Sequence, residues 1–275
     1  MSKKFFILQC AAILAGFVAC SDGSGDGRSA ISGMVWIEPG IFPMGSPDKE
    51  PDRNSNEAQH WVELTQGFSM GKHPVTQAQY RAVMGYNDSY FRDDNQPVER
   101  VTWYDAIEFC NKLSEAEGLQ TVYLINNRVP ASGYPITDAT VTPNWKRNGY
   151  RLPTEAQWEY ACRAGTTTAY NTGAVISGAT GWYDANSGSK THPVGQKPAN
   201  KWGLYDMHGN VFEWCWDWYA VYPGGTQTDP EGPGSGADRV VRGGSWNYYG
   251  RSARSAYRAY DNPDNRYFGF RLVCP

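Results

Sequence analysis

The sequence lacks a basic excess, closely spaced cysteines and any long hydrophobic run. Its 275 residues carry 25 Lys and Arg against 28 Asp and Glu, which gives a formal net charge of −3. This acidic balance, without a basic stripe, argues against a nucleic-acid binder. The four His are scattered and no two of the six Cys form a C-x-x-C pair, so no zinc site is indicated. The spacing also brings together no paired carboxylates and no Ser-His-Asp set.

The most apolar stretch of the chain, residues 5–18, is too short to cross a membrane comfortably. It directly follows Lys3 and Lys4, and a short apolar run behind a basic start is typical of an export signal. We therefore expect residues 1–19 to be a signal peptide that is removed on export.

Cys20 stands at the predicted cleavage site. The residues before it, Phe17, Val18 and Ala19, resemble the cleavage sequence of bacterial lipoproteins, in which this cysteine is acylated. Phe17 replaces the usual Leu-like residue, so ordinary signal cleavage nearby is the alternative. Residues 20–32 are rich in Gly, Ser and Asp and predict a flexible tether. We expect an exported lipoprotein that a lipid on Cys20 anchors to a membrane, at the outer membrane or the cell surface.

Three helices are predicted by the same N-terminal signal. Thr76, Thr102 and Thr154 each precede a polar residue three positions later, which is the pattern of a Thr cap. Apolar residues at helical spacing extend the second helix to about Ala116. Gly165 ends the third helix, which is short.

Strands are predicted from alternating apolar residues and turn residues. Residues 34–46 have the pattern of a hairpin, residues 61–70 that of one strand, and residues 121–149 that of a hairpin with an irregular excursion. Residues 211–218 place four aromatic side chains on one face of a half-buried strand. Since no internal repeat or linker is present, we expect one α+β domain, residues 33–275, with much irregular structure.

Residues 247–268 differ in composition from the rest of the chain. They contain no Lys, Glu, Gln, Met, Trp, Leu, Val, Ile or Thr. They consist largely of Tyr, Ser, Gly, Asn and Arg, with which recognition loops combine a large contact area with little loss of side-chain entropy. An aromatic surface loop without a ligand is the alternative. The flanking RGGSW (242–246) and GFRLV (269–273) have the pattern of fixed ends, the latter that of a buried strand.

Eight short blocks are spread over nearly the whole mature chain, among them RLPTEAQWEYA and GNVFEW; they occupy residues 34–46, 74–76, 97–103, 151–161, 203–207, 209–214, 242–246 and 269–271. In this order they resemble the formylglycine-generating-enzyme, or sulfatase-modifying factor, family. The resemblance implies an elaborated C-type-lectin-like fold with little regular secondary structure. It is specific for the fold and does not fix the chemistry.

In the enzymes of this family, a cysteine pair just past the Gly-Gly-Ser-aromatic motif binds copper and carries out the oxidation. Tyr248 and Ala253 stand at the corresponding positions, and no cysteine occurs between Cys215 and Cys274. A phenol and a methyl group cannot replace two thiolates. We therefore expect a non-catalytic protein that requires no cofactor. A formylglycine-type oxidase, or another enzyme on this fold, is the alternative.

The C-terminal segment also resembles the variable proteins of diversity-generating retroelements, which share this fold. Those proteins end in RGGSW, R-S-A-x-R, P-x-x-R and GFR, and this chain keeps each block between residues 242 and 271. In those systems, randomised template adenines can turn an Asn codon into many codons, but not into those for Lys, Gln, Glu, Met or Trp. The absence of these five residue types from residues 247–268 agrees with such an origin. The resemblance implies a variable region at about residues 240–273.

The same resemblance implies which side chains contact a ligand. They are Tyr248, Tyr249, Gly250, Arg251, Ser252, Tyr257, Ala259, Tyr260, Asp261, Asn262, Asp264, Asn265, Tyr267 and Phe268. The ligand would be a protein or a glycan at the cell surface. A structural envelope lipoprotein with an inert aromatic loop is a further alternative.

Some side chains of the variable region are expected to support it. We expect Trp246 and Phe270 in the core. Buried guanidinium groups could bond loop carbonyls and hold the path of the loop whatever its neighbours are, with solvated surface arginines as the alternative. The candidates are Arg254, Arg258, Arg266 and Arg271.

Two further features are implied by the family resemblance. The family holds a structural calcium ion near the turn that matches residues 209–214, where Glu213 is the side chain to carry over. A strand Glu that faces solvent or pairs with an Arg is the alternative. Some members join two cysteines at positions that match Cys162 and Cys274; two buried thiols are the alternative.

Overall fold

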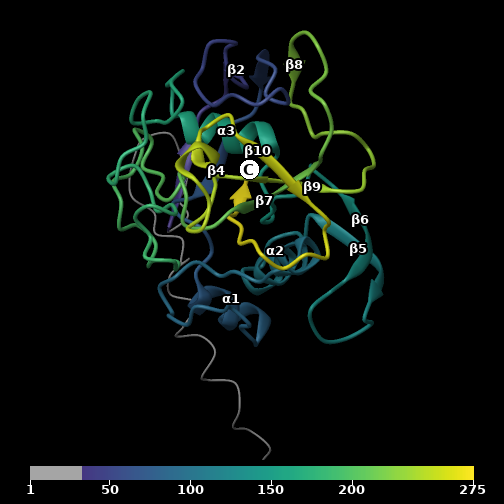
Figure 1. Cartoon of the computed structure of the whole chain (residues 1–275). Helices are drawn as coiled ribbons and strands as arrows, with labels where there is room; N and C mark the ends of the chain where they lie inside the picture. The colour runs from purple at the N-terminus through teal and green to yellow at the C-terminus, as the bar shows by residue number, and fades with distance from the viewer. Residues whose placement is uncertain (1–32) are drawn as a thin grey trace, which may run out of the picture.

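The computed structural model describes residues 33–275 as short strands, three α-helices and long irregular connections (Figure 1). The predicted signal peptide, Cys20 and the tether lie outside the described residues. Within residues 33–275, none of the helices combines the length and the apolar character that crossing a membrane requires. The mixed α+β architecture with much irregular structure is as predicted.

The strands form four small sheets. In strand order they are β1-β4-β11 (Met34–Ile37, Phe68–Gly71, Val273–Cys274), β10-β9-β7 (Arg258–Asp261, Arg239–Arg242, Glu213–Trp218), β2-β3-β8 (Gly40–Met44, His60–Leu64, Gln227–Thr228) and β5-β6 (Tyr123–Val129, Asp138–Pro143). The β5-β6 pair confirms the hairpin predicted for residues 121–149.

The helices are α1 (Gln77–Met84), α2 (Trp103–Ala116) and α3 (Glu155–Arg163), and each confirms a predicted Thr cap. In each helix the Thr hydroxyl accepts from the third backbone N–H, while the side chain at that third position accepts from the backbone N–H of the Thr. This reciprocal capping satisfies two otherwise unpaired donors. Helix α2 ends at Ala116, as the spacing of its apolar residues predicts.

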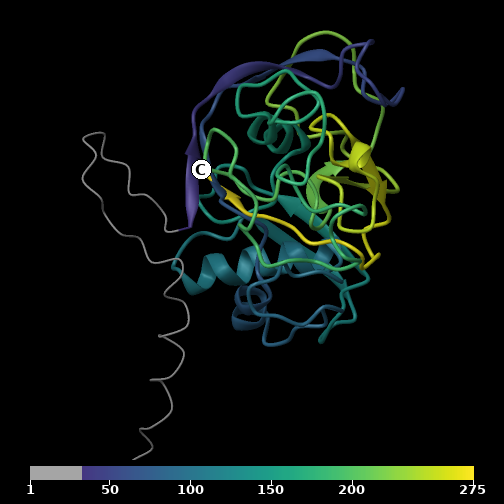
Figure 2. The same ribbon diagram turned by 60° about the vertical axis from the view of Figure 1, so that its left-hand side comes forward.

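The C-terminal segment runs through the middle of the molecule, between α2 and α3 (Figure 2). Phe270 and Leu272 pack in one buried cluster with side chains of α2, while Val273 packs in a second cluster with side chains of α3. Alternate side chains of this extended segment therefore join the two parts of the core. Phe270 is fully buried, as predicted.

Two strand predictions near the N-terminus are wrong. Residues 34–46 do not form a hairpin, because β1 pairs with β4 and β2 pairs with β3. Residues 61–70 belong to two strands, because the chain leaves the β2-β3-β8 sheet after Leu64 and enters the β1-β4-β11 sheet at Phe68. At that point the N–H of Thr65 donates to the Asp229 carboxylate instead of continuing a strand ladder. The partner strands are distant in sequence, which a local pattern does not reveal.

The prediction of a half-buried strand at residues 211–218 is also wrong in part. Glu213 to Asp217 are all buried, so both faces of β7 are covered. Helix α3 covers the second face, where Trp158 donates its indole N–H to Glu213 at 2.8 Å. On the first face, the ring of Trp103 packs against that of Trp216, with centroids 5.4 Å apart. The period of two is present, but a helix replaces solvent on the other side.

Candidate ligand-binding surface

Residues 247–268 follow a sharp turn that requires glycine. Gly243 and Gly244 follow β9 with φ of +100° and +74°. A Cβ at Gly244 would lie 2.9 Å from the Cα of Ala253. The chain then forms a short 3₁₀ helix, η1 (Gly250–Ala253), and returns as β10 beside β9. This turn thus brings η1 close to the end of β9.

Four tyrosines of the variable region point outward. Tyr248, Tyr249, Tyr260 and Tyr267 are 46%, 63%, 52% and 75% exposed. Arg251, Asn262 and Asp264 are exposed as well. The exposed side chains thus combine large aromatic area with polar and charged groups of both signs, which suits a recognition surface.

The aromatic side chains of this surface meet around Phe212, which precedes β7. The centroid of the Phe212 ring lies 5.0 Å from that of Tyr248, 6.1 Å from that of Phe268 and 6.4 Å from that of Tyr257. Three separate parts of residues 247–268 therefore surround this one ring. Beyond it, Tyr260 stacks on Tyr219, with ring centroids 4.1 Å apart.

Not every predicted contact residue is accessible. Ser252 is 5% exposed, and its N–H donates to the Tyr249 carbonyl within η1. Phe268 is 7% exposed and packs edge-on against Trp214 at 4.7 Å. These two residues support the surface instead of forming it. Five candidates are partly buried, namely Gly250, Tyr257, Ala259, Asp261 and Asn265. The prediction that Trp246 belongs to the core is wrong, because its ring is half-buried.

Buried ion pairs connect Arg254 and Arg258 to carboxylates from other parts of the chain. Both oxygens of Glu57 accept from Arg254 at 2.7 Å, and Glu50 accepts a further hydrogen bond from it at 2.8 Å. Both oxygens of Glu155 accept from Arg258 at 2.7 Å. The prediction of buried arginines is confirmed for these two positions. Their main partners, however, are carboxylates, and loop carbonyls come second.

The other two candidate arginines, Arg266 and Arg271, differ in burial. Arg271 is fully buried and forms a forked pair with Glu213, at 2.6 and 2.7 Å. Arg266 is half-buried and pairs with Asp88. Only the first of them is a core residue.

Glu213 does not fit the predicted calcium ligand. Its carboxylate is fully buried and accepts two hydrogen bonds from Arg271 and one from Trp158. A guanidinium group therefore neutralises the charge that a calcium ion would need. Within residues 33–275, no group of three or more His, Cys, Asp or Glu side chains is arranged to hold a metal ion.

The four cysteines of the described chain are buried free thiols. The predicted disulfide is wrong, because the Cys162 sulfur lies 3.6 Å from the Ser255 hydroxyl whereas the Cys274 sulfur lies 3.9 Å from the Met34 sulfur. Burial raises the pKa of each of these two thiols to about 12. Neither is thus a ready thiolate.

The positions matching the copper-binding cysteines do not fit copper either. Tyr248 is 46% exposed, and Ala253 is a buried methyl group at 1% exposure. A thiolate pair, which the resemblance requires for that metal, is absent at this place.

Asp217 and Glu155 are two buried carboxylates close to one another, and Glu155 is the partner of Arg258 in β10. Burial, and then the nearby Glu155 carboxylate, raise the pKa of Asp217 to about 7. Burial alone would raise the pKa of Glu155 too, but Arg258 and Arg242 lower it below its usual value. Asp217 accepts from the Glu155 N–H at 2.7 Å and so binds the start of α3. Of the two, Asp217 is therefore the one that holds a proton near neutral pH.

We expect the stability of the unchanged protein, called the parent below, to depend on pH through Asp217. Its folded-state pKa lies above the unfolded value, so its contribution is complete below about pH 4 and is lost as the pH rises to about 7. Asp217→Asn keeps an acceptor for the α3 N–H and removes this dependence. At pH 8 the variant should unfold at a higher temperature than the parent, and at pH 4 this advantage should vanish. Thermal unfolding of both proteins from pH 4 to 8 tests this, and parallel curves would contradict it.

Several residues of the surface and its support have no signal in the sequence. Glu57 lies in a charged loop, and Glu155 has the pattern of an ordinary residue in the first turn of a helix. Tyr219, which stacks on Tyr260, follows β7 without any motif. Phe212 and Glu155 belong to blocks that carry the family resemblance, but the resemblance assigns neither of them a role at this surface.

Comparison with known proteins places the chain in a family. The model of the sulfatase-modifying factor enzyme 1-like domain matches residues 21–274. "Chaperone protein LppX" of Paenibacillus barcinonensis is 38% identical over 268 residues, which cover 89% of this chain and 88% of that protein. The formylglycine-generating enzyme of Mus musculus is 30% identical over 290 residues, with 91% and 77% covered.

A solved structure is similar to this one as well. Treponema denticola variable protein 1 superposes with a TM-score of 0.78 at 37% identity, over 88% of this chain and 94% of that one. Both resemblances inferred from the sequence are thereby confirmed, to the formylglycine-generating enzymes and to a variable protein. The chain belongs to the sulfatase-modifying factor enzyme 1-like family.

Proposed function

We propose that this protein is a non-catalytic, surface-displayed lipoprotein whose C-terminal segment is a diversified ligand-binding site. The observation that carries the proposal is the division of residues 247–268 into two sets. Four tyrosines are 46–75% exposed, while Arg254 and Arg258 are 1% and 3% exposed and are paired with carboxylates from other parts of the chain. Because the buried set fixes the path of the backbone, the exposed set can change without moving it.

The relatives fit this role. A variable protein and a protein named as a chaperone are both similar over most of this chain. The similarity to formylglycine-generating enzymes favours the alternative of an oxidase. Against that alternative stand the side chains at positions 248 and 253, which cannot supply thiolates.

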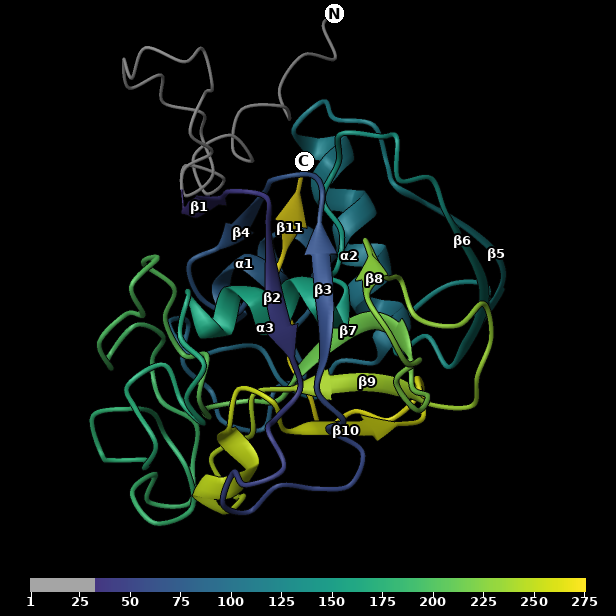
Figure 3. The same cartoon turned by 90° about the horizontal axis from the view of Figure 1, so that it is seen from above.

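The position of β1 supports display. Strand β1, with which the described chain begins, lies on the opposite side of the molecule from η1 and β10 (Figure 3). If a lipid on Cys20 anchors the chain through residues 20–32, the anchor enters at β1. The ligand-binding surface would then face away from the membrane.

The shape of the surface favours a protein ligand over a small molecule. None of the fourteen candidate contact residues lines the two cavities of about 610 and 360 Å³. Four tyrosines instead lie on the surface with 46–75% exposure, and exposed faces rich in Tyr suit protein partners.

Diversification is tested on the DNA. We expect a near-copy of the codons for residues 240–275 close downstream, differing from them mainly at adenines and lying beside a gene for a reverse transcriptase. A genome without such a repeat would exclude diversification, while leaving a fixed binding surface intact.

Absence of oxidase activity is expected from the missing thiolates. The purified protein, supplied with copper, a reductant and a sulfatase-type cysteine peptide, should form no aldehyde above the control without protein. A parallel assay with an active formylglycine-generating enzyme shows that the conditions are adequate. Turnover by this protein would contradict the non-catalytic role.

A further inference from the structure

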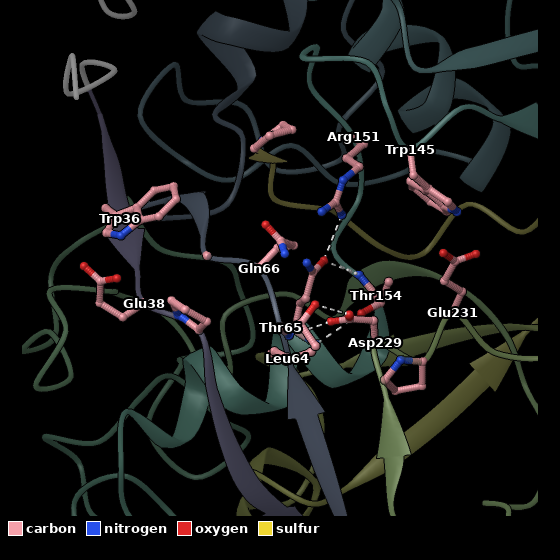
Figure 4. A pocket seen from close by; sticks show the side chains of 15 residues that line it. Trp36, Glu38, Leu64, Thr65, Gln66, Trp145, Arg151, Thr154, Asp229 and Glu231 are labelled. Atoms are coloured by element: carbon pink, nitrogen blue, oxygen red, sulfur yellow. Dashed lines mark hydrogen bonds between the residues drawn. The ribbon is translucent and has the colours of Figure 1, made fainter. Parts of the chain in front are cut away.

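A second candidate site lies in the larger of the two cavities, apart from the fourteen candidate contact residues. This cavity of about 610 Å³ opens between β1, the connection from β3 to β4, the start of α3 and the residues after β8 (Figure 4). Its volume is within the range of ordinary ligand pockets, at roughly 300–1,000 Å³. The variable region contributes none of its fourteen candidate contact residues to the lining.

Two tryptophans stand on opposite sides of this cavity. Figure 4 shows Trp36 on one side and Trp145 on the other. Trp36 is 37% exposed, and Trp145 is fixed edge-on against Trp216 with centroids 5.1 Å apart. Indole rings offer flat apolar area to the C–H groups of a ligand.

Hydrogen-bond donors lie between the two rings. Arg151 donates through a single nitrogen, Nη1, to Gln157 at 2.8 Å and to the Leu152 carbonyl at 3.1 Å. Its Nε and Nη2 atoms, and the amide nitrogen of Gln157, form no hydrogen bond to another residue within 33–275. Gln157 is held in place because its oxygen also accepts from the Thr154 N–H at 3.1 Å. A fixed set of donors is thus left for a ligand.

Acceptors line the same space. Asp229 is oriented by the N–H and the hydroxyl of Thr65, and Glu38 and Glu231 lie on either side in Figure 4. Asp229 and Glu231, against the one guanidinium group of Arg151, oppose an anionic ligand. A cation is opposed beside Trp145, because Arg151 already lies 5.3 Å from the centroid of that ring. A neutral ligand whose groups both donate and accept hydrogen bonds fits donors and acceptors that line the same cavity.

We propose that this cavity binds a neutral oligosaccharide. A sugar hydroxyl both donates and accepts, so it can use the free donors of Arg151 and Gln157 and the carboxylates together. The C–H faces of pyranose rings can lie against the two indoles. This site is independent of the variable surface and of the function proposed for it.

The experiment is saturation-transfer NMR on the purified exported chain with neutral oligosaccharides at millimolar concentration. Separate sets come from bacterial envelopes and from animal cells, which identifies the source, and oligosaccharides with uronic acid or free amines are included. We expect transfer to neutral members of at least one set. Transfer to none of them, or only to charged ones, would overturn the proposal.

Two variants then locate the site, with affinity for the strongest neutral ligand measured by calorimetry. Gln157→Glu keeps the acceptor for Arg151 and Thr154 and replaces the amide donor by a charged oxygen, and Trp36→Ala removes one ring. Each should weaken binding tenfold or more. Trp61→Ala, at a tryptophan that is 53% exposed and outside the cavity, should not. Parent affinity in both cavity variants would overturn the assignment. A variant in which the four exposed tyrosines of the variable surface are changed to Ser should bind the oligosaccharide with the affinity of the parent, which would show that the two sites are separate.

Discussion

Changing Tyr248, Tyr249, Tyr260 and Tyr267 together to Ser is expected to abolish ligand binding while leaving the fold intact. Tyrosines are frequent binding hot spots, and a hot-spot residue costs about 2 kcal/mol or more when it is truncated, so two hot spots among these four already give a loss of more than about 100-fold. Their exposure of 46–75% means that little core packing is lost. The substitutions of Tyr249 and Tyr267 should each change stability by no more than about 0.5 kcal/mol. Those of Tyr248 and Tyr260 should each cost about 0.5–1.5 kcal/mol, because they lose the ring contacts with Phe212 and Tyr219. Tyr257 is left unchanged because it is half-buried.

The measurement pairs thermal unfolding with affinity for a protein ligand isolated by screening extracellular proteins against the parent chain. A matched control changes Ile41, Trp61 and Leu124 to Ser, which are 53–59% exposed and lie outside the variable region. The control should bind like the parent. If the tyrosine variant fails to fold, those rings belong to the core; if it folds and still binds, the ligand contacts another surface.

Composition predicts much of this surface, because a recognition loop needs residue types that a core does not. It cannot tell which members of the loop point inward. Ser252 and Phe268 have the same composition signal as their neighbours but are 5% and 7% exposed. Their orientation follows from η1 and from the contact of Phe268 with Trp214, neither of which has a local pattern.

The three helices could be predicted with their first residues because a Thr cap acts within one turn of the chain. The strands could not be paired in the same way. Partners such as β4 and β11 are about 200 residues apart in sequence, and a covering helix changes which face of β7 is buried. The same limit applies to the ion pairs: the arginines are visible in the sequence, whereas Glu57 lies 197 residues from Arg254.

Replacing Arg254, the buried cation that directly follows η1, is expected to have the largest effect on stability. Arg254→Met leaves Glu57 and Glu50, whose side chains are 0% and 5% exposed, without their shared partner. Breaking a buried ion pair on one side costs about 3–5 kcal/mol, because the remaining charge is not solvated. For a domain of this size the melting temperature should fall by roughly 10 °C. Ligand binding should weaken as well, since Arg254 ties η1 to the loop at residues 50–57.

The double variant Arg254→Met with Glu57→Gln separates an uncompensated charge from lost packing. If charge is the cause, the second substitution restores part of the stability, because it removes a buried carboxylate that has no cation. An exposed pair gives the control: Arg81 and Asp94 have side chains 49% and 62% exposed, so Arg81→Met should cost less than about 1 kcal/mol. Equal losses for Arg254→Met and Arg81→Met would show that the buried arginines do not hold the variable region. The exposed tyrosines would then lack the rigid support on which their free variation depends.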